Sequence, residues 1–153
     1  HKGKIVAGVI YDAAKDELFW AEKGEGAWLN ESRLRVSSRS RMIEAIFATG
    51  VPFGGHGDLP ATLQDMARLL PTCAGVRRWG AAALDMAYVA AGRYEGFWER
   101  NLNAWDVAAG EIIVREAGGL IETVSGDGSV VETGDVLCAN EAIFAKFASV
   151  IRG

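Results

Sequence analysis

The change in hydrophobic pattern near residue 36 constrains the fold of this chain more than any other feature. Before it, the apolar segments 4–11, 17–21 and 27–29 are separated only by short polar or glycine-containing turns, which is typical of an antiparallel β-meander. After it, short apolar strands alternate with helical segments of roughly ten to fourteen residues. The sequence therefore predicts a layered α/β fold, with a β-meander over 1–36 and an α/β domain over 37–153.

The second part of the chain supplies five expected strands and four expected helices. The strands are predicted at 45–49, 76–79, 94–99, 120–124 and 136–139. The helices are predicted at 59–70, 82–91 and 104–117, and after the N-cap residue Asn140. Helical spacing predicts the buried face of the first helix to be Leu63, Met66, Ala67 and Leu70. The same spacing predicts the buried face of the last helix to be Ile143, Phe144, Phe147, Val150 and Ile151.

Composition excludes several classes of protein. Half of the residues are hydrophobic and 24% are charged, which is typical of a globular domain. No apolar stretch reaches the ~18 residues of a transmembrane helix, so no membrane association is expected. A net charge of −4 argues against a basic nucleic-acid-binding face. Cys73 and Cys138 are expected to be free buried thiols, which indicates a reducing, cytoplasmic location.

Several residues with chemical potential have ordinary structural interpretations. The five tryptophans are expected to be mostly core anchors. The glycine-rich loop 54–57 carries His56, and two interpretations remain open: a plain surface loop, or a loop whose histidine titrates near neutral pH.

Asp106 is the most informative candidate for chemistry. It falls in the first turn of the helix expected at 104–117, three residues after the N-cap candidate Asn103. The positive end of the helix dipole would keep its carboxylate ionised and fixed in orientation. A fixed carboxylate suits Mg²⁺, which tolerates little positional error, but it also suits a simple capping box. Both interpretations remain open at this stage.

The chain resembles the inositol monophosphatase family over nearly its whole length. The most specific match is the signature WDVAAG at 105–110, followed by IIVREAGG at 112–119. Further blocks match in order and spacing at 8–12, 16–19, 24–30, 49–53, 77–85 and 138–140. The resemblance implies a sugar-phosphatase-like αβαβα sandwich, in which this chain supplies the C-terminal portion.

The resemblance also implies an activity and a set of site residues. Members hydrolyse phosphate monoesters with Mg²⁺, many are inhibited by lithium, and they tend to form homodimers. Asp106 matches the aspartate that binds a catalytic Mg²⁺ and contacts a substrate hydroxyl, and Glu99 matches the acid that hydrogen-bonds the sugar or cyclitol. Gly80, Ala81 and Ala82 match the lining of the substrate pocket, although Ala81 replaces a common Thr or Ser. A small phosphorylated polyol is therefore the expected substrate.

One part of the family pattern does not occur in this sequence. The family's other metal ligands are a Glu and an Asp-Pro-x-Asp-Gly-Thr segment, and neither is found in the 153 residues. Because adjacent Mg²⁺ ions need several clustered carboxylates, this portion alone is expected to be inactive. The alternatives are a non-catalytic binding or assembly module, and a related phosphatase acting on histidinol phosphate, a nucleotide bisphosphate or fructose bisphosphate.

Overall fold

The computed structural model describes residues 1–54 and 57–153. His56 lies outside the described residues, so neither interpretation of its loop is tested. The predicted meander is present as a four-stranded antiparallel sheet in the order β1-β2-β3-β4. Its strands are β1 (Ala7–Asp12), β2 (Glu17–Glu22), β3 (Gly26–Leu29) and β4 (Ser32–Arg33). The first strand begins three residues later than predicted, and the short fourth strand was not predicted.

All five strands expected in the second part form one mixed sheet, in the order β6-β5-β7-β9-β8. They are β5 (Ile46–Thr49), β6 (Gly75–Arg77), β7 (Gly96–Glu99), β8 (Gly119–Glu122) and β9 (Val136–Asn140). Strand β5 runs parallel to β6 and β7, whereas β9 is antiparallel to both of its neighbours. The carboxyl ends of β6, β5 and β7 therefore meet at one edge of the sheet.

The four predicted helices are present, and each differs from its expected bounds by no more than one residue. The helices are α1 (Leu59–Leu69), α2 (Ala82–Ala90), α3 (Ala104–Glu116), α4 (Val130–Thr133) and α5 (Glu141–Arg152). The one-turn helix α4 was not predicted, nor were the 3₁₀ turns Met42–Glu44 and Leu70–Thr72. In the described part of the chain, no helix has the length and apolar character needed to cross a bilayer.

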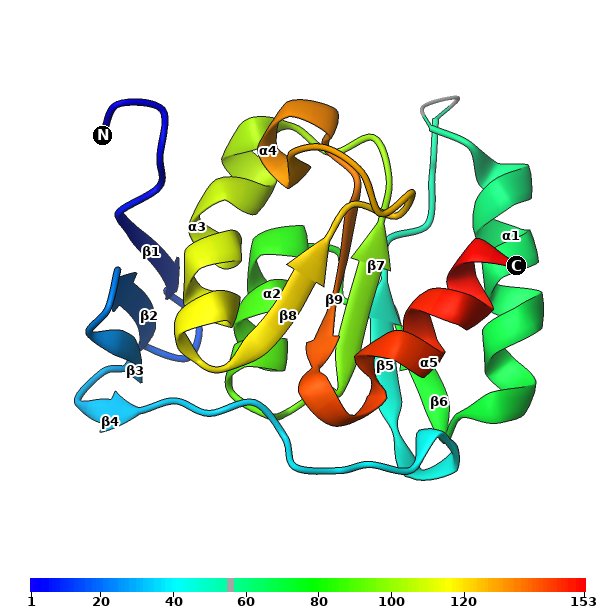
Figure 1. Cartoon of the computed structure of the whole chain (residues 1–153), viewed down its shortest axis with the longest axis horizontal. Coiled ribbons are helices and arrows are strands. Elements are labelled where there is room, and N and C mark those ends of the chain that lie inside the picture. The colour runs from blue at the N-terminus through cyan, green and yellow to red at the C-terminus, as the bar shows by residue number, and fades with distance from the viewer. Residues whose placement is uncertain (55–56) are drawn as a thin grey trace.

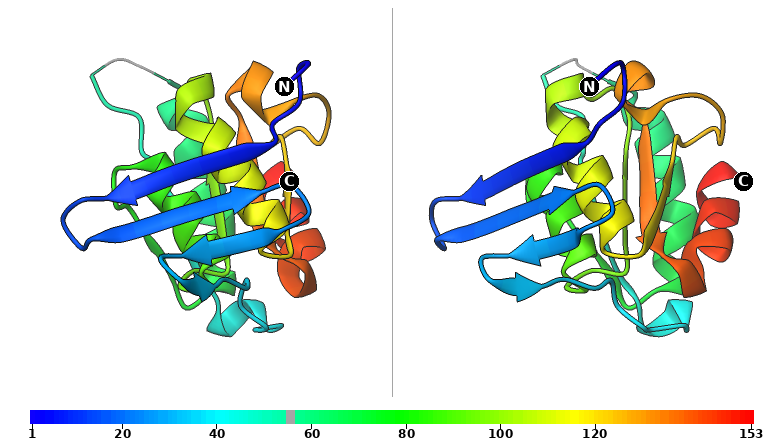
Figure 2. Two further views of the ribbon diagram at one scale, coloured as in Figure 1. Left: turned by 90° about the vertical axis from the view of Figure 1, so that its left-hand side faces the viewer. Right: turned by 60° about the vertical axis from the view of Figure 1, so that its left-hand side comes forward.

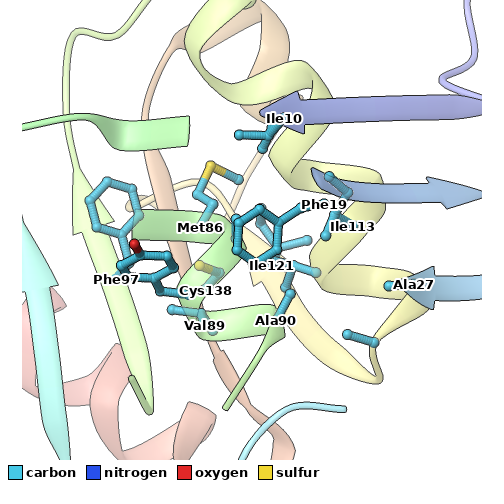
Figure 3. Close-up of a cluster of buried hydrophobic side chains, with 14 of the residues drawn as sticks. Ile10, Phe19, Ala27, Met86, Val89, Ala90, Phe97, Ile113, Ile121 and Cys138 are labelled. Atoms are coloured by element: carbon cyan, nitrogen blue, oxygen red, sulfur yellow. The ribbon is translucent and has the colours of Figure 1, made fainter. Parts of the chain in front are cut away.

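The elements stack in four layers, as Figures 1 and 2 show. Helices α2 and α3 lie between the two sheets, and α1 and α5 cover the opposite face of the second sheet. One core fills the space around α2 and α3, where Met86 lies between Phe97 of β7 and Phe19 of β2, and Ile113 lies beside Phe19 (Figure 3). A second core, which includes Phe147, lies under α1 and α5. The layered α/β fold is thus confirmed, and the division into two domains at residue 36 stays a prediction.

The small residues of α3 allow a close approach by the first sheet. A Cβ atom at Gly8 of β1 would lie 2.9 Å from both the Cα and the carbonyl oxygen of Ala109. Real Cβ atoms do not approach backbone atoms so closely, so only glycine fits there. Ala109 therefore serves packing between β1 and α3, whereas Gly110 makes room for Met86 of α2.

The predicted buried face is wrong for α1 and confirmed for α5. The inner face of α1 carries Thr62, Asp65 and Leu69, whereas the predicted Leu63 and Leu70 are 53% and 47% exposed. Asp65 can be buried because Arg68, Trp98 and Arg100 all donate hydrogen bonds to its carboxylate. The buried face of α5 is as predicted, with four of its five expected residues buried and Val150 partly buried.

The tryptophans were also misjudged, because only Trp98 is fully buried. Trp79 and Trp105 are 55% and 78% exposed, and Trp20 and Trp28 are half-buried. The last two stack on one another with their ring centroids 5.8 Å apart, so each covers part of the other. Both cysteines are buried and free, as expected.

Candidate active site

A cavity of about 410 Å³ opens at the carboxyl ends of β5, β6 and β7. Its walls are the segments 50–53, 78–82 and 99–103 that follow these strands, together with the start of α1 and the first turn of α3. Ligands of open α/β sheets bind at this position, outside the carboxyl ends of parallel strands. All five predicted site residues line this one cavity: Gly80, Ala81, Ala82, Glu99 and Asp106.

Glu99 is the last residue of β7, and its carboxylate lies over the backbone of Gly50. A Cβ atom at Gly50 would overlap that carboxylate, so glycine leaves room for the carboxylate in this position. Thr49 joins the ends of the two strands, because its Oγ1 donates a hydrogen bond of 2.7 Å to the Trp98 carbonyl oxygen. These contacts fix Glu99 at the floor of the cavity.

The electrostatic surroundings of Glu99 favour the protonated form of its carboxyl group. Its pKa is raised to about 7, first by burial and then by the negative charge of Asp106. The positive charge of Arg78 and a hydrogen bond from the Gly50 backbone act in the opposite direction. Near neutral pH this carboxyl can therefore either accept or donate a hydrogen bond to a hydroxyl group of a ligand.

Asp106 reaches the cavity from the first turn of α3. The chain reverses at Asn101, which has a φ of +60°, and its N–H donates a hydrogen bond of 3.1 Å to Asp135. Asn103 is the N-cap residue, and its backbone N–H donates to Oδ2 of Asp106 at 2.9 Å. The capping interpretation of Asp106 is therefore confirmed, and the metal interpretation stays a prediction beside it.

The donor chemistry around Asp106 fits Mg²⁺ only in part. Carboxylate oxygens are the ligands that Mg²⁺ prefers. Across residues 1–54 and 57–153, however, no group of three or more His, Cys, Asp and Glu side chains is placed to hold a metal ion. Asp106 can thus supply one ligand of a Mg²⁺ site, and further ligands are needed to complete the site.

The segment 80–82 forms the opposite, apolar part of the wall. Gly80 has a φ of +93°, which turns the chain into α2, and Ala81 is the N-cap residue of that helix. An alanine N-cap leaves the first N–H groups of α2 without a side-chain partner. The change from Thr or Ser to Ala81 therefore removes a hydroxyl group from this wall.

Sequence reasoning assigned no role to Arg78, Arg100 and Asp85, which are charged residues at or beside the site. Arg78 and Arg100 line the cavity, and Arg78 lies over the ring of Phe53 at 6.0 Å. Asp85 lies one turn behind Ala82, is 1% exposed, and its Oδ1 has no hydrogen-bond partner among the described residues. Its pKa is raised to about 7 by burial and by the charge of Glu99, against the charge of Arg78. The sequence did contain a signal for Asp85, because it is an acidic residue within the otherwise apolar sequence of α2.

The fold and the position of the cavity define a layered α/β protein with an acidic ligand site. Comparison with known proteins identifies the family: residues 1–152 match the inositol monophosphatase family, and the chain belongs to it. An inositol-1-monophosphatase from Rhizobium meliloti (strain 1021) is 46% identical over 151 residues, which cover 99% of this chain and 57% of that protein. The Nus factor SuhB of Pasteurella multocida (strain Pm70) is 42% identical over the same shares of the two chains.

A solved structure agrees with these sequence matches. The crystal structure of the extragenic suppressor protein suhB from Bartonella henselae superimposes with a TM-score of 0.94 at 44% identity. The match covers 99% of this chain and 59% of that one. The chain thus spans somewhat more than half the length of the relatives that it matches.

Proposed function

We propose that the protein containing this chain is a Mg²⁺-dependent phosphatase that hydrolyses a small phosphorylated polyol. The family of this chain implies a phosphatase. The single observation that carries the proposal for this site is that all five residues expected from the family line one cavity. A cavity of about 410 Å³ has the size of a small-molecule site.

Each residue has a role that follows from its position. Asp106 would hold Mg²⁺, and the hydrogen bond from the Asn103 N–H fixes the direction of its carboxylate. Glu99 would bind substrate hydroxyl groups, because its carboxyl can both donate and accept near neutral pH. The backbone at Gly80 and the methyl groups of Ala81 and Ala82 would shape the wall against the polyol ring.

The metal supplies the chemistry that these residues lack. When bound, Mg²⁺ provides positive charge at the phosphoryl oxygens and activates the attacking water. The remaining ligands would come from outside the described residues, so the isolated chain is expected to be inactive. Phosphoryl transfer depends mainly on positioning and electrostatics, which is consistent with a site built from fixed carboxylates.

The test is Asp106→Asn in the protein that contains this chain, measured by phosphate release over a titration of Mg²⁺. We expect kcat to fall by about two orders of magnitude or more and the Mg²⁺ requirement to rise, because a metal ligand is lost. Asp127→Asn is the matched control, since this aspartate is exposed and does not line the cavity. Unchanged kcat and Mg²⁺ dependence in Asp106→Asn would falsify the proposal.

Several finer expectations accompany this function. Homodimerisation, a cytoplasmic location, lithium sensitivity and the absence of nucleic-acid binding are predictions that follow from the resemblance and the composition. Relatives named as phosphatases and relatives named as Nus factors match this chain at similar identity. A substrate panel therefore decides between a polyol phosphate and the alternatives, and turnover by the isolated chain would contradict the expected inactivity.

A further inference from the structure

The wall of the cavity formed by α1 carries an arginine whose direction is fixed from behind. Arg100 follows β7 directly, lines the cavity, and its side chain is 21% exposed. Its Nη1 donates a hydrogen bond to Oδ2 of Asp65 on the inner face of α1. Asp65 is fully buried, so it holds the guanidinium from the protein side.

The carboxylate of Asp65 is held by three donors from different parts of the fold. Besides Arg100, it accepts hydrogen bonds from Arg68 at 2.8 Å and from the Trp98 indole at 3.2 Å. Arg68 also donates to the Ile151 carbonyl oxygen at 2.6 Å, which ties the cluster to α5. The position of Arg100 is therefore fixed by α1, α5 and β7 together.

This cluster retains positive charge and free donors toward the cavity. Two guanidinium groups share one carboxylate, so the cluster of Asp65, Arg68 and Arg100 has a net charge of about +1. Among the described residues, only Nη1 of Arg100 has a hydrogen-bond partner, and none of its nitrogens is buried without one. Within the described part of the chain, its Nε and Nη2 therefore have no partner and are not fully buried. Asp58, a carboxylate on the same wall, is engaged as the N-cap of α1 and accepts from the Ala61 N–H at 2.9 Å.

The cluster and Asp106 belong to different walls of the cavity. Asp106 lies at the start of α3, whereas Arg100 extends toward α1, and the strands of the second sheet lie between these helices (Figure 1). A phosphate held beside Asp106 by Mg²⁺ and an anion held by Arg100 would therefore be two separate groups of one ligand. Fixed guanidinium groups bind phosphate and carboxylate strongly, because little ordering is needed on binding.

We propose that Arg100, held in place by Asp65, binds a second anionic group of the substrate at the α1 wall of the cavity. The preferred substrates are then polyol phosphates that carry a further phosphate or carboxylate group besides the phosphate that is hydrolysed. This inference rests on the proposed phosphatase function and adds to it the class of substrate. Asp65 acts only through Arg100 and is a positioning residue.

The test compares a hexitol monophosphate with the corresponding hexitol bisphosphate on the protein that contains this chain. Arg100→Gln is expected to lower kcat/KM for the bisphosphate about ten-fold or more, the size of one charge-assisted hydrogen bond, through KM rather than kcat. The value for the monophosphate should change little. Arg77→Gln is the matched control, because Arg77 is exposed at the same edge and lies outside the cavity. Among residues 1–54 and 57–153, its guanidinium donates only to the Val76 carbonyl oxygen.

Asp65→Asn tests the positioning role with Arg100 still present. The ratio of kcat/KM for the two substrates should fall toward that of Arg100→Gln, while a purely structural defect would lower both values together. Should Asp65→Asn fail to fold, the ratio measured for Arg100→Gln decides the proposal alone. Equal losses for both substrates, or none, in Arg100→Gln would overturn it.

Direct binding separates this inference from the proposed function. Isothermal titration of the bisphosphate into the wild type and Arg100→Gln measures the contact without turnover. If the wild type hydrolyses neither compound, the phosphatase proposal fails, while a roughly ten-fold loss of affinity in Arg100→Gln still supports the anion site. Equal affinities of the two proteins for the bisphosphate would refute the anion site whether or not the enzyme is active.

Discussion

Asp85 makes the stability of this protein depend on pH. Its side chain is 1% exposed, and among the described residues its Oδ1 has no hydrogen-bond partner. Burial and the charge of Glu99 raise its pKa from 3.8 to about 7. The unfolded chain releases this proton near pH 4, whereas the folded chain retains it until about pH 7.

The sign of the effect follows from proton binding in the two states. Between these pKa values the folded state holds more protons, so the free energy of unfolding falls as pH rises. The contribution of Asp85 is complete below about pH 4 and is lost as the pH passes through about 7. At about 1.4 kcal/mol for each pH unit, the full loss is about 4 kcal/mol, of which about 3 kcal/mol falls between pH 5 and pH 8.

Asp85→Asn removes the titrating group and keeps the shape of the side chain. Urea unfolding of the wild type and the variant across about pH 5 to pH 8 gives the difference in free energy of unfolding at each pH. We expect the variant to gain about 3 kcal/mol relative to the wild type over this interval. In Arg78→Gln, the loss of stability should move to higher pH than in the wild type, because the charge of Arg78 lowers the pKa of Asp85. A difference that does not vary with pH would refute the reasoning.

Two further predictions concern the site and the fold. Gly50→Ala places a methyl group where the Glu99 carboxylate lies, so KM for a polyol phosphate should rise about ten-fold, the equivalent of one good hydrogen bond, in steady-state kinetics; an unchanged KM would contradict this geometry. Asn140→Ala removes the cap that accepts from the Ile143 N–H at 3.1 Å, and the free energy of unfolding should fall by about 1 to 2 kcal/mol in urea. An unchanged unfolding midpoint would contradict that capping role.

Most of the secondary structure could be predicted because local signals agreed with the fold. The capping residue Asn140 and the apolar spacing of α5 specify the same helix, and the structure contains it. The first turn of α3 was predicted for the same reason, since Asn103 and Asp106 form a cap that depends only on neighbouring residues. Local chemistry therefore placed Asp106 at the start of a helix before any tertiary contact was known.

The inner face of α1 could not be predicted because it depends on residues far away in the sequence. Hydrophobic spacing favours Leu63 and Leu70, and an aspartate would normally be assigned to solvent. Asp65 is buried only because Arg100, 35 residues later, supplies a donor together with Trp98 and Arg68. No local pattern reports a pairing at that separation, and the same pairing places Arg100 in the cavity.

The buried aspartates Asp65 and Asp85 differ in how their burial is compensated. Asp65 accepts three hydrogen bonds, so its charge is compensated and its burial is compatible with a stable fold. Asp85 has an oxygen without a partner in the part of the chain that the structure describes, and packing alone offers no reason to keep an acid there. The cavity beside Asp85 offers such a reason, because the charges of Glu99 and Arg78 both act on the Asp85 carboxyl. If Asp85→Asn stabilises the protein above neutral pH and also alters how kcat/KM depends on pH, the lost stability is the consequence of maintaining that group of charges.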